Sequence, residues 1–253
     1  MMLDIPIEPL LGLNDPDPVQ IVNPGGRSDL LLIGDHAGNV VPAALGSLGI
    51  GLDDLVRHIG WDTGIAGLGT ALAAMLDAVF IRQTYSRLVI DCNRDPARAD
   101  AMPAVSDGTR IPANEALTDA DRAARVAAIN APYQAAIAAE LTRRDAGGRR
   151  TQLVSLHSFT PAMAGVARPW QVGVLHDRGE LSLTHRTLSR LRADPALTVG
   201  DNEPYRMDGI DHTVPRHAYP DRPYVELEVR QDLLADAAGV AAWAARLATV
   251  LGE

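Results

Sequence analysis

Short runs of apolar residues alternate along the chain with longer segments in which apolar residues recur every three or four positions. The longer segments predict amphipathic helices facing a core, at 64–76, 119–145, 183–192 and 236–251. We expect Pro132 to kink or split the second of these helices. The short runs predict buried strands, at Leu30–Ile33, Ala78–Ile81, Leu88–Asp91, Leu153–Leu156, Val172–Leu175 and Tyr224–Val229, with a short edge strand at Val19–Val22.

Strands and helices alternate throughout the chain, which predicts an α/β fold with a mixed, mostly parallel sheet and helices on both faces. No linker rich in Ser, Gly or Pro separates two cores, so we expect one domain over 1–253. Residues 1–29 are rich in Pro, Asp, Gly and Asn and are expected to form a leader over the surface. The segments 95–118 and 200–222 are predicted to be long loops, and loops of this length are usually functional or disordered.

Composition removes several classes of function. The chain has 23 basic and 32 acidic residues, a net charge of −9, which argues against nucleic acid and an anionic membrane surface as partners. The segment 65–81 is too short and too polar to cross a membrane. The first residues carry Asp4 and Glu8 and no basic region, so no signal peptide is expected. A single cysteine, Cys92, excludes an intramolecular disulfide and suits a reducing cytoplasm.

Polar side chains stand at the ends of four predicted strands: His36, Asn93 with Arg94, His157 and Glu228. Ligands of open α/β sheets bind where loops leave the carboxyl ends of strands. Taken singly, each residue has an ordinary explanation, such as a hydrogen-bonded loop histidine or a solvated charge. Glu226 and Glu228 could both be edge-strand charges, and we expect only one of them, Glu228, to face the site. Together the four positions suit a catalytic zinc site, which needs about three His or carboxylate ligands and a carboxylate base.

Six segments of the chain resemble the N-formylglutamate amidohydrolase family. Each motif is weak alone, but all six come in the same order and span roughly residues 30–235. That family is similar in fold and site to the zinc carboxypeptidases. The resemblance implies a hydrolase that uses one zinc ion per chain to cleave the N-formyl or N-acyl amide of glutamate or a similar carboxylate-bearing amino acid. The segments are Gly34–Pro42, His58–Gly64, Ser86–Arg94, Ser106–Gly108 with Ile111–Asn114, Leu156–Phe159 and Glu226–Asp232.

The resemblance also implies roles for single residues. His36 and His157 match the two zinc histidines, and Glu228 matches the general base. The pair Asn93-Arg94 resembles the carboxypeptidase residues that hold a substrate carboxylate. One departure matters: Asn39 stands where the carboxypeptidases have a glutamate ligand, and an amide oxygen is a poor zinc ligand. Asp62 is our candidate for the third ligand, with a helix N-cap as the equally weighted alternative for Asp62 or Thr63.

Several other residues keep open interpretations. Arg87 could polarise the scissile carbonyl or form a structural ion pair. His58 could orient Asp62 if the intervening turn is helical. His217 and His212, in the second long loop, could contact substrate or donate a proton, and His176 has no motif support.

Two rival functions remain at this point. One is a cysteine hydrolase using Cys92 as nucleophile, although Cys92 also fits the description of a small buried hydrophobe. The other is a non-catalytic protein that binds carboxylates, which Asn39 favours. The sequence leaves open the acyl group, the amino acid and the oligomeric state.

Overall fold

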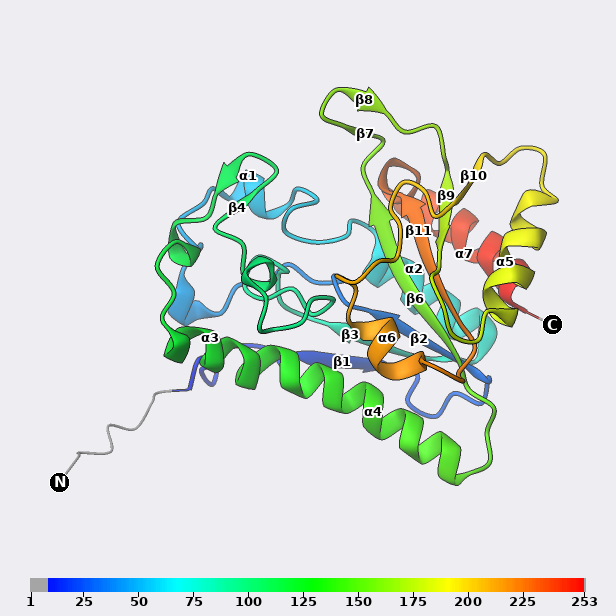
Figure 1. Ribbon diagram of the computed structural model, residues 1–253, viewed down its shortest axis with the longest axis horizontal. Coiled ribbons are helices and arrows are strands. Elements are labelled where there is room, and N and C mark those ends of the chain that lie inside the picture. The colour runs from blue at the N-terminus through cyan, green and yellow to red at the C-terminus, as the bar shows by residue number, and fades with distance from the viewer. Residues whose placement is uncertain (1–8, 253) are drawn as a thin grey trace.

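A computed structural model describes residues 9–252 of the chain, and a seven-stranded β-sheet lies at its centre (Figure 1). The order across the sheet is β1-β3-β2-β6-β11-β9-β10. These strands are β1 (Val19–Val22), β2 (Leu30–Gly34), β3 (Val79–Gln83), β6 (Gln152–Phe159), β9 (Val172–Leu175), β10 (Val199–Asp201) and β11 (Tyr224–Arg230).

The sheet is mixed and mostly parallel, as predicted. β3, β2, β6 and β11 are consecutive parallel neighbours, and β10 is parallel to β9. β1 runs antiparallel to β3, and β9 runs antiparallel to β11. All five residues of β2 are buried, which explains its continuous apolar run, since a central parallel strand is covered on both faces. The carboxyl ends of β2, β6 and β11 therefore meet at one edge of the sheet.

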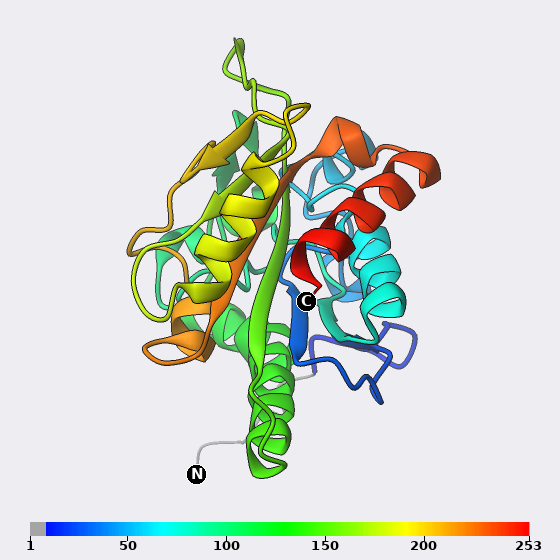
Figure 2. The same cartoon turned by 90° about the vertical axis from the view of Figure 1, so that its right-hand side faces the viewer.

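Helices cover both faces of the sheet, and the fold class expected from the sequence is confirmed. One face carries α2 (Ile65–Leu76), α5 (Ser182–Arg192) and α7 (Ala237–Leu251), and Figure 2 shows α2 and α7 side by side. Alternate residues of β2 divide between the two cores. Leu30 and Leu32 pack toward α2 and α7, whereas Leu31 and Ile33 pack on the other face toward α4 (Ala131–Ala146).

The helix predicted over 119–145 is split, as Pro132 required. α3 (Asp119–Arg125) begins with a capping box between Thr118 and Asp121 and passes into a π-helical segment, Val126–Asn130. Pro132 then lies in the first turn of α4. Proline lacks an N–H and clashes with the preceding helical turn, so it is tolerated at a helix start and not inside one. The wider π-turn accommodates the change.

The leader packs on the edge of the sheet. Its residues 19–22 form the predicted edge strand β1, and Leu10 and Leu11 pack against the core of the α4 face. The Tyr85 hydroxyl donates a hydrogen bond of 2.6 Å to the carbonyl of Pro16. Residues 1–8, also assigned to the leader, lie outside the described part of the chain.

The strand predicted at Leu88–Asp91 is wrong: this apolar run is a buried turn. Its carbonyl groups bond to side chains instead of a neighbouring strand. Asn114 Nδ2 donates to the Leu88 carbonyl (2.8 Å) and Arg125 Nη1 to the Val89 carbonyl (3.0 Å). Because these side chains satisfy the buried backbone, the run needs no strand partner, and an apolar pattern alone cannot reveal this.

The two long loops contain more structure than predicted. The first holds the hairpin of β4 (Val105–Ser106) and β5 (Thr109–Arg110), and the second ends in α6 (Thr213–Ala218). The other α-helix of residues 9–252 is the short α1 (Leu52–Leu55), and the other two strands, β7 (Ala162–Met163) and β8 (Val166–Ala167), form a hairpin. Short 3-10 helices lie at Ala43–Leu45, Ala99–Ala101, Pro112–Asn114 and Gln231–Leu234. Within residues 9–252, none of the helices is both long enough and apolar enough for a bilayer span.

Candidate active site

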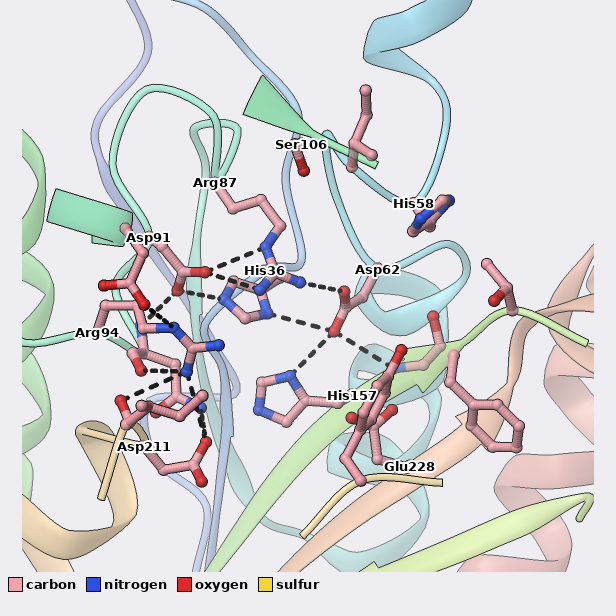
Figure 3. Close-up of a pocket in the computed structure, with 18 of the residues that line it drawn as sticks. His36, His58, Asp62, Arg87, Asp91, Arg94, Ser106, His157, Asp211 and Glu228 are labelled. Carbon is pink, nitrogen blue, oxygen red and sulfur yellow. Dashed lines mark hydrogen bonds and ion pairs between the residues drawn. The ribbon is translucent and has the colours of Figure 1, made fainter. Parts of the chain in front are cut away.

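A cavity of about 580 Å³ opens at the sheet edge where β2 ends. It is lined by His36, from the loop after β2, and by Asp62, from the loop before α2. His157 comes from β6, and Glu226 and Glu228 come from β11 (Figure 3). His157 lies within β6, because this strand continues to Phe159, beyond its predicted end at Leu156. Glu228 lies two residues before the end of β11.

His36, Asp62 and His157 converge on one point. One potential ligand atom from each lies within 4.8 Å of the others. Asp62 Oδ2 is 2.9 Å from His157 Nδ1 and 3.4 Å from His36 Nδ1, and each of the three residues is only 3% exposed. Asp62 thus stands between the two histidines, which makes these three residues a possible metal-binding group.

The alternative interpretation of Asp62 and Thr63 as helix N-caps is wrong. Gly64 is the N-cap of α2, with φ of 83°, and no side chain caps this helix. The left-handed conformation favours glycine, and a Cβ at position 64 would lie 2.4 Å from that of Leu234. The Asp62 backbone N–H donates instead to the carbonyl of His36 (2.9 Å), which turns the Asp62 carboxylate into the cavity.

Two further aspartates hold the outer nitrogens of the histidines. Asp91 Oδ1 is 2.6 Å from His36 Nε2, and Asp35 Oδ2 is 3.5 Å from His157 Nε2. Burial opposes the charged histidine, but the carboxylates of Asp35 and Asp62 beside it raise the pKa of His157 well above its usual value. The sequence reasoning missed both aspartates. Their signal was their place in the recognised motifs, directly beside His36 and two residues before Asn93.

This arrangement fits a metal ion. Within residues 9–252, no group hydrogen-bonds to the buried Nδ1 of His36, so this nitrogen has a lone pair to offer. Metal-binding histidines almost always donate their other ring N–H to a carboxylate or carbonyl, as His36 can to Asp91. The other ring nitrogen of His157, Nε2, lies 3.1 Å from Ser155 Oγ and 3.5 Å from Asp35 Oδ2. Three such ligands leave a fourth position of a tetrahedral ion free for water or substrate.

Both glutamates of β11 face the cavity, so the expectation that only Glu228 does so is wrong. Residues two apart on a strand share a face of the sheet. Glu228 stands opposite His157 in the parallel pair of β11 and β6, and Glu226 stands opposite Ser155. Burial raises the pKa of Glu226 to about 8 and that of Glu228 to about 7, although His157 acts to lower both.

These raised pKa values predict how the metal-free protein responds to pH. Between the unfolded pKa of 4.5 and the folded values, the folded protein retains protons that the unfolded chain releases. Stability should therefore fall as pH rises from about 5 to 8, by up to about 1.4 kcal/mol per pH unit for each glutamate. Glu226→Gln should flatten this fall in urea titrations with a chelator present. The exposed Glu115→Gln variant is the control and should keep the wild-type slope; an equal slope in Glu226→Gln would contradict the prediction.

Arg87 lines the cavity as part of an ion-pair network. Its Nη2 lies 2.7 Å from Asp91 Oδ2 and its Nη1 lies 3.4 Å from Asp62 Oδ1. The guanidinium thus joins the carboxylate behind His36 to the carboxylate between the histidines (Figure 3). Although burial opposes it, the charges of Asp91 and Asp62 raise the pKa of Arg87, so the group stays cationic beside the site.

Asn93 and Arg94 also line the cavity, but the Asn93 amide is already engaged. Asn93 Oδ1 accepts from the backbone N–H groups of His212 and Thr213, both at 3.0 Å, and its Nδ2 donates to Asp211 at 3.2 Å. Arg94 lines the same cavity, and the expected substrate contact of both residues stays a prediction. Asn93 fixes the beginning of α6.

The remaining histidines lie away from the metal-binding group. His217 Nε2 bonds to Gln134 Oε1 (2.7 Å) in α4, and His217 is not among the described residues that line the cavity, so the structure gives its predicted substrate contact no support. His176 pairs with Asp201 (2.8 Å), and His212 contributes its backbone. His58 lines the cavity but faces Asp107 at 3.5 Å and not Asp62, contrary to its predicted orienting role.

Cys92 is not placed as a nucleophile. It is fully buried and absent from the cavity lining among the described residues. Burial raises the pKa of its thiol well above the usual value, which disfavours the reactive thiolate. The interpretation of Cys92 as a small buried residue holds, and the cysteine-hydrolase alternative loses its nucleophile.

A possible metal-binding group beside buried glutamates, at the edge of a mixed α/β sheet, is typical of hydrolases that activate water with a metal ion. The sequence model of N-formylglutamate amidohydrolase matches residues 28–235. The chain therefore belongs to the N-formylglutamate amidohydrolase family, as the motifs indicated, and this family membership supports amide hydrolysis.

Solved structures agree with this assignment. The gene product Atu2144 from Agrobacterium tumefaciens is 35% identical, with a TM-score of 0.92 over 96% of each chain. An N-formylglutamate amidohydrolase from Ralstonia eutropha JMP134 is 21% identical, with a TM-score of 0.69 over 93% of this chain and 96% of that one, and shows the same fold. No curated protein matches the chain.

Proposed function

We propose that this protein is a zinc-dependent amidohydrolase that removes the formyl or acyl group from the nitrogen of a carboxylate-bearing amino acid. The observation that carries the proposal is the buried convergence of His36, Asp62 and His157 beside Glu228 in the cavity of a family member. Two histidines and a carboxylate match the ligand set of hydrolytic zinc enzymes. One ion per chain follows from the single group of this kind found among the described residues.

The mechanism assigns each side chain a task. When bound, a zinc ion supplies Lewis acidity, which makes water acidic and polarises a carbonyl. Glu228 accepts a proton from the attacking water and delivers it to the departing amine, which balances the hydrolysis. The Glu228 carboxyl would be held ionised, and so ready as a base, by the positive charge of an ion bound at His36, Asp62 and His157. Asp91 and Asp35 orient His36 and His157, and Arg87 adds positive charge where the oxyanion develops.

Arg94 is the proposed anchor for the substrate carboxylate. A guanidinium can bind a carboxylate through two parallel N–H bonds. The protein is acidic overall, so long-range charge repels an anionic substrate and a local cation is needed. Arg94 projects into the same cavity as the metal-binding group, which sets the amide at the site when the carboxylate is bound.

Arg94→Ala should lower kcat/KM on a good N-formyl amino acid substrate by about 10- to 150-fold, the value of one lost charged hydrogen-bond contact. Amidation of the substrate's α-carboxylate should lower kcat/KM of the wild type by a comparable factor. It should change kcat/KM of Arg94→Ala little, because that variant already lacks the arginine. Arg110→Ala, which removes an exposed arginine paired with Glu115, is the matched control. If the wild type hydrolyses neutral amides as well as their carboxylate counterparts, Arg94 has no role in substrate binding.

Metal content and hydrolysis, measured together, test the proposed function. Protein purified without a histidine tag should contain about one zinc per chain and release formate from N-formyl amino acids. A chelator should abolish the activity and added zinc should restore it. Activity that survives complete metal removal, or metal-replete protein that cleaves none of these amides, would contradict the proposal. Inhibition by a thiol reagent in wild type but not in Cys92→Ala would instead revive the cysteine mechanism.

A further inference from the structure

Negative charge predominates in the lining of the cavity. Eight carboxylates and three arginines line it within the described residues. Arg87 is committed to Asp62 and Asp91, and Arg206 is exposed, where solvent weakens its effect. Among the described residues that line the cavity, Arg94 is then the one partly buried arginine left for substrate. If a substrate with two carboxylates, such as N-formylglutamate, bound here, Arg94 could pair with one of them. The second carboxylate would lie among the negatively charged side chains of the lining.

Arg94 itself stands between two carboxylates. Asp211 Oδ1 lies 3.7 Å from its Nη1, and Asp100 Oδ2 lies 3.8 Å from its Nε. These separations are longer than a direct hydrogen bond, so the guanidinium can still take a carboxylate. Asp211 is fixed in place, because it accepts from Asn93 Nδ2 at 3.2 Å and from the backbone N–H of Asp208 at 3.1 Å. The cavity therefore presents a cation and an anion side by side, a pair that complements a zwitterion.

Glu226 supplies a second, independent observation. It is only 2% exposed, lines the cavity, and its Oε2 has no hydrogen-bond partner within residues 9–252. The mechanism uses Glu228 and leaves Glu226 without a task. Burial and the nearby charges of Asp211 and Glu228 disfavour a charge on Glu226 unless a cation lies beside it. A positively charged group of a ligand would satisfy it.

We propose that the cavity selects N-acyl amino acids whose side chain carries a positive charge, with the α-carboxylate on Arg94 and the side-chain cation directed to Asp211 and Glu226. N-formyl-lysine and N-formyl-ornithine represent this class. The inference rests on the proposed function, since the same metal-binding group and Glu228 would act on the amide. It differs from that function in replacing the second carboxylate of N-formylglutamate by a cation.

The test compares three substrates of the zinc-loaded enzyme: N-formyl-L-lysine, N-formyl-L-norleucine and N-formyl-L-glutamate. We expect kcat/KM for the lysine derivative to exceed that for the norleucine derivative by about tenfold to hundredfold, and the glutamate derivative to be the poorest. Asp211→Asn and Glu226→Gln should each reduce the ratio of kcat/KM for the lysine derivative to that for the norleucine derivative by at least about fivefold. This corresponds to the loss of roughly half of the free energy of the charged contact. Asp53→Asn, the same charge change at an exposed position on α1, should leave the ratio unchanged.

Calorimetric binding of free L-lysine, L-norleucine and L-glutamate separates the two proposals, because it needs no turnover. If lysine binds most tightly while no amide is hydrolysed, the charge selectivity stands and the proposed function fails. If N-formylglutamate is the best substrate and glutamate the tightest ligand, the inference fails and the proposed function stands. A lysine preference that survives in both Asp211→Asn and Glu226→Gln would also overturn the inference.

Discussion

Replacing Glu228 by glutamine should reduce kcat by at least about 10²-fold while the protein keeps its full metal content. General-base groups typically contribute about 10²- to 10⁴-fold, and the amide of glutamine cannot accept the proton of the attacking water. The glutamine side chain has nearly the size of the glutamate that it replaces, so the buried packing of β11 should survive. Steady-state formate release and elemental analysis of the same samples measure the two quantities.

Glu226→Gln is the matched control for this experiment, because Glu226 lies two residues away on the same face and in the same cavity. On a substrate without a charged side chain, such as N-formyl-norleucine, Glu226→Gln should keep most of its kcat. Loss of activity in Glu226→Gln with retention in Glu228→Gln would exchange the roles of the two residues. Loss of zinc in Glu228→Gln would mean that Glu228 is a ligand.

The double variant His36→Ala, His157→Ala should lose zinc and all measurable hydrolysis. Two of the three proposed ligands are then gone, and a single aspartate cannot hold an ion in this geometry. Asp62→Asn should weaken zinc binding sharply without the loss of about 1 kcal/mol expected from a lost helix cap, since Gly64 and not Asp62 caps α2. A zinc titration beside a thermal melt distinguishes these effects.

The double variant His176→Ala, His185→Ala removes two histidines that lie outside the cavity lining, and it controls for unspecific zinc binding. It should retain the wild-type stoichiometry. Full zinc content in His36→Ala, His157→Ala would place the ion elsewhere and end the proposal for this group. Weak zinc binding together with a lowered melting temperature in every variant would indicate general damage to the fold.

The sequence predicted most of the sheet because its central strands are covered on both faces. In a chain that alternates strands and helices, a continuous apolar run such as Leu30–Ile33 predicts a strand that is buried on both faces of the sheet. The same reasoning failed at Leu88–Asp91, where Asn114 and Arg125 satisfy the buried carbonyl groups. Asn114 and Arg125 are 26 and 36 residues away from the carbonyl groups that they bond. The local sequence pattern around Leu88–Asp91 therefore cannot predict them.

The candidate site divides in a similar way. His36 and His157 were predicted from their places after apolar runs and from the family resemblance, and Asp62 as the carboxylate that could replace the ligand missing at Asn39. The structure brings the three together. The role of Asn93 and the position of His217 depend on where α6 is placed, which is a tertiary property. The expectation that Glu226 faces away from the site failed for a simpler reason: residues two apart on one strand share a face.

Asn93 accepts hydrogen bonds from the backbone N–H groups of His212 and Thr213, and we call this pair of bonds the Asn93 clamp. The clamp fixes the carboxyl end of the segment 202–211, which forms one wall of the cavity. The segment from 202 to 211 carries Tyr205, Asp208 and Asp211 into the cavity. It is bounded by β10 at one end and by the Asn93 clamp at the other. The metal-binding group and Glu228 come from other parts of the chain. Replacing this one segment would therefore change the residues that face Arg94 while leaving Arg94, Glu226, Glu228 and the metal-binding group unaltered.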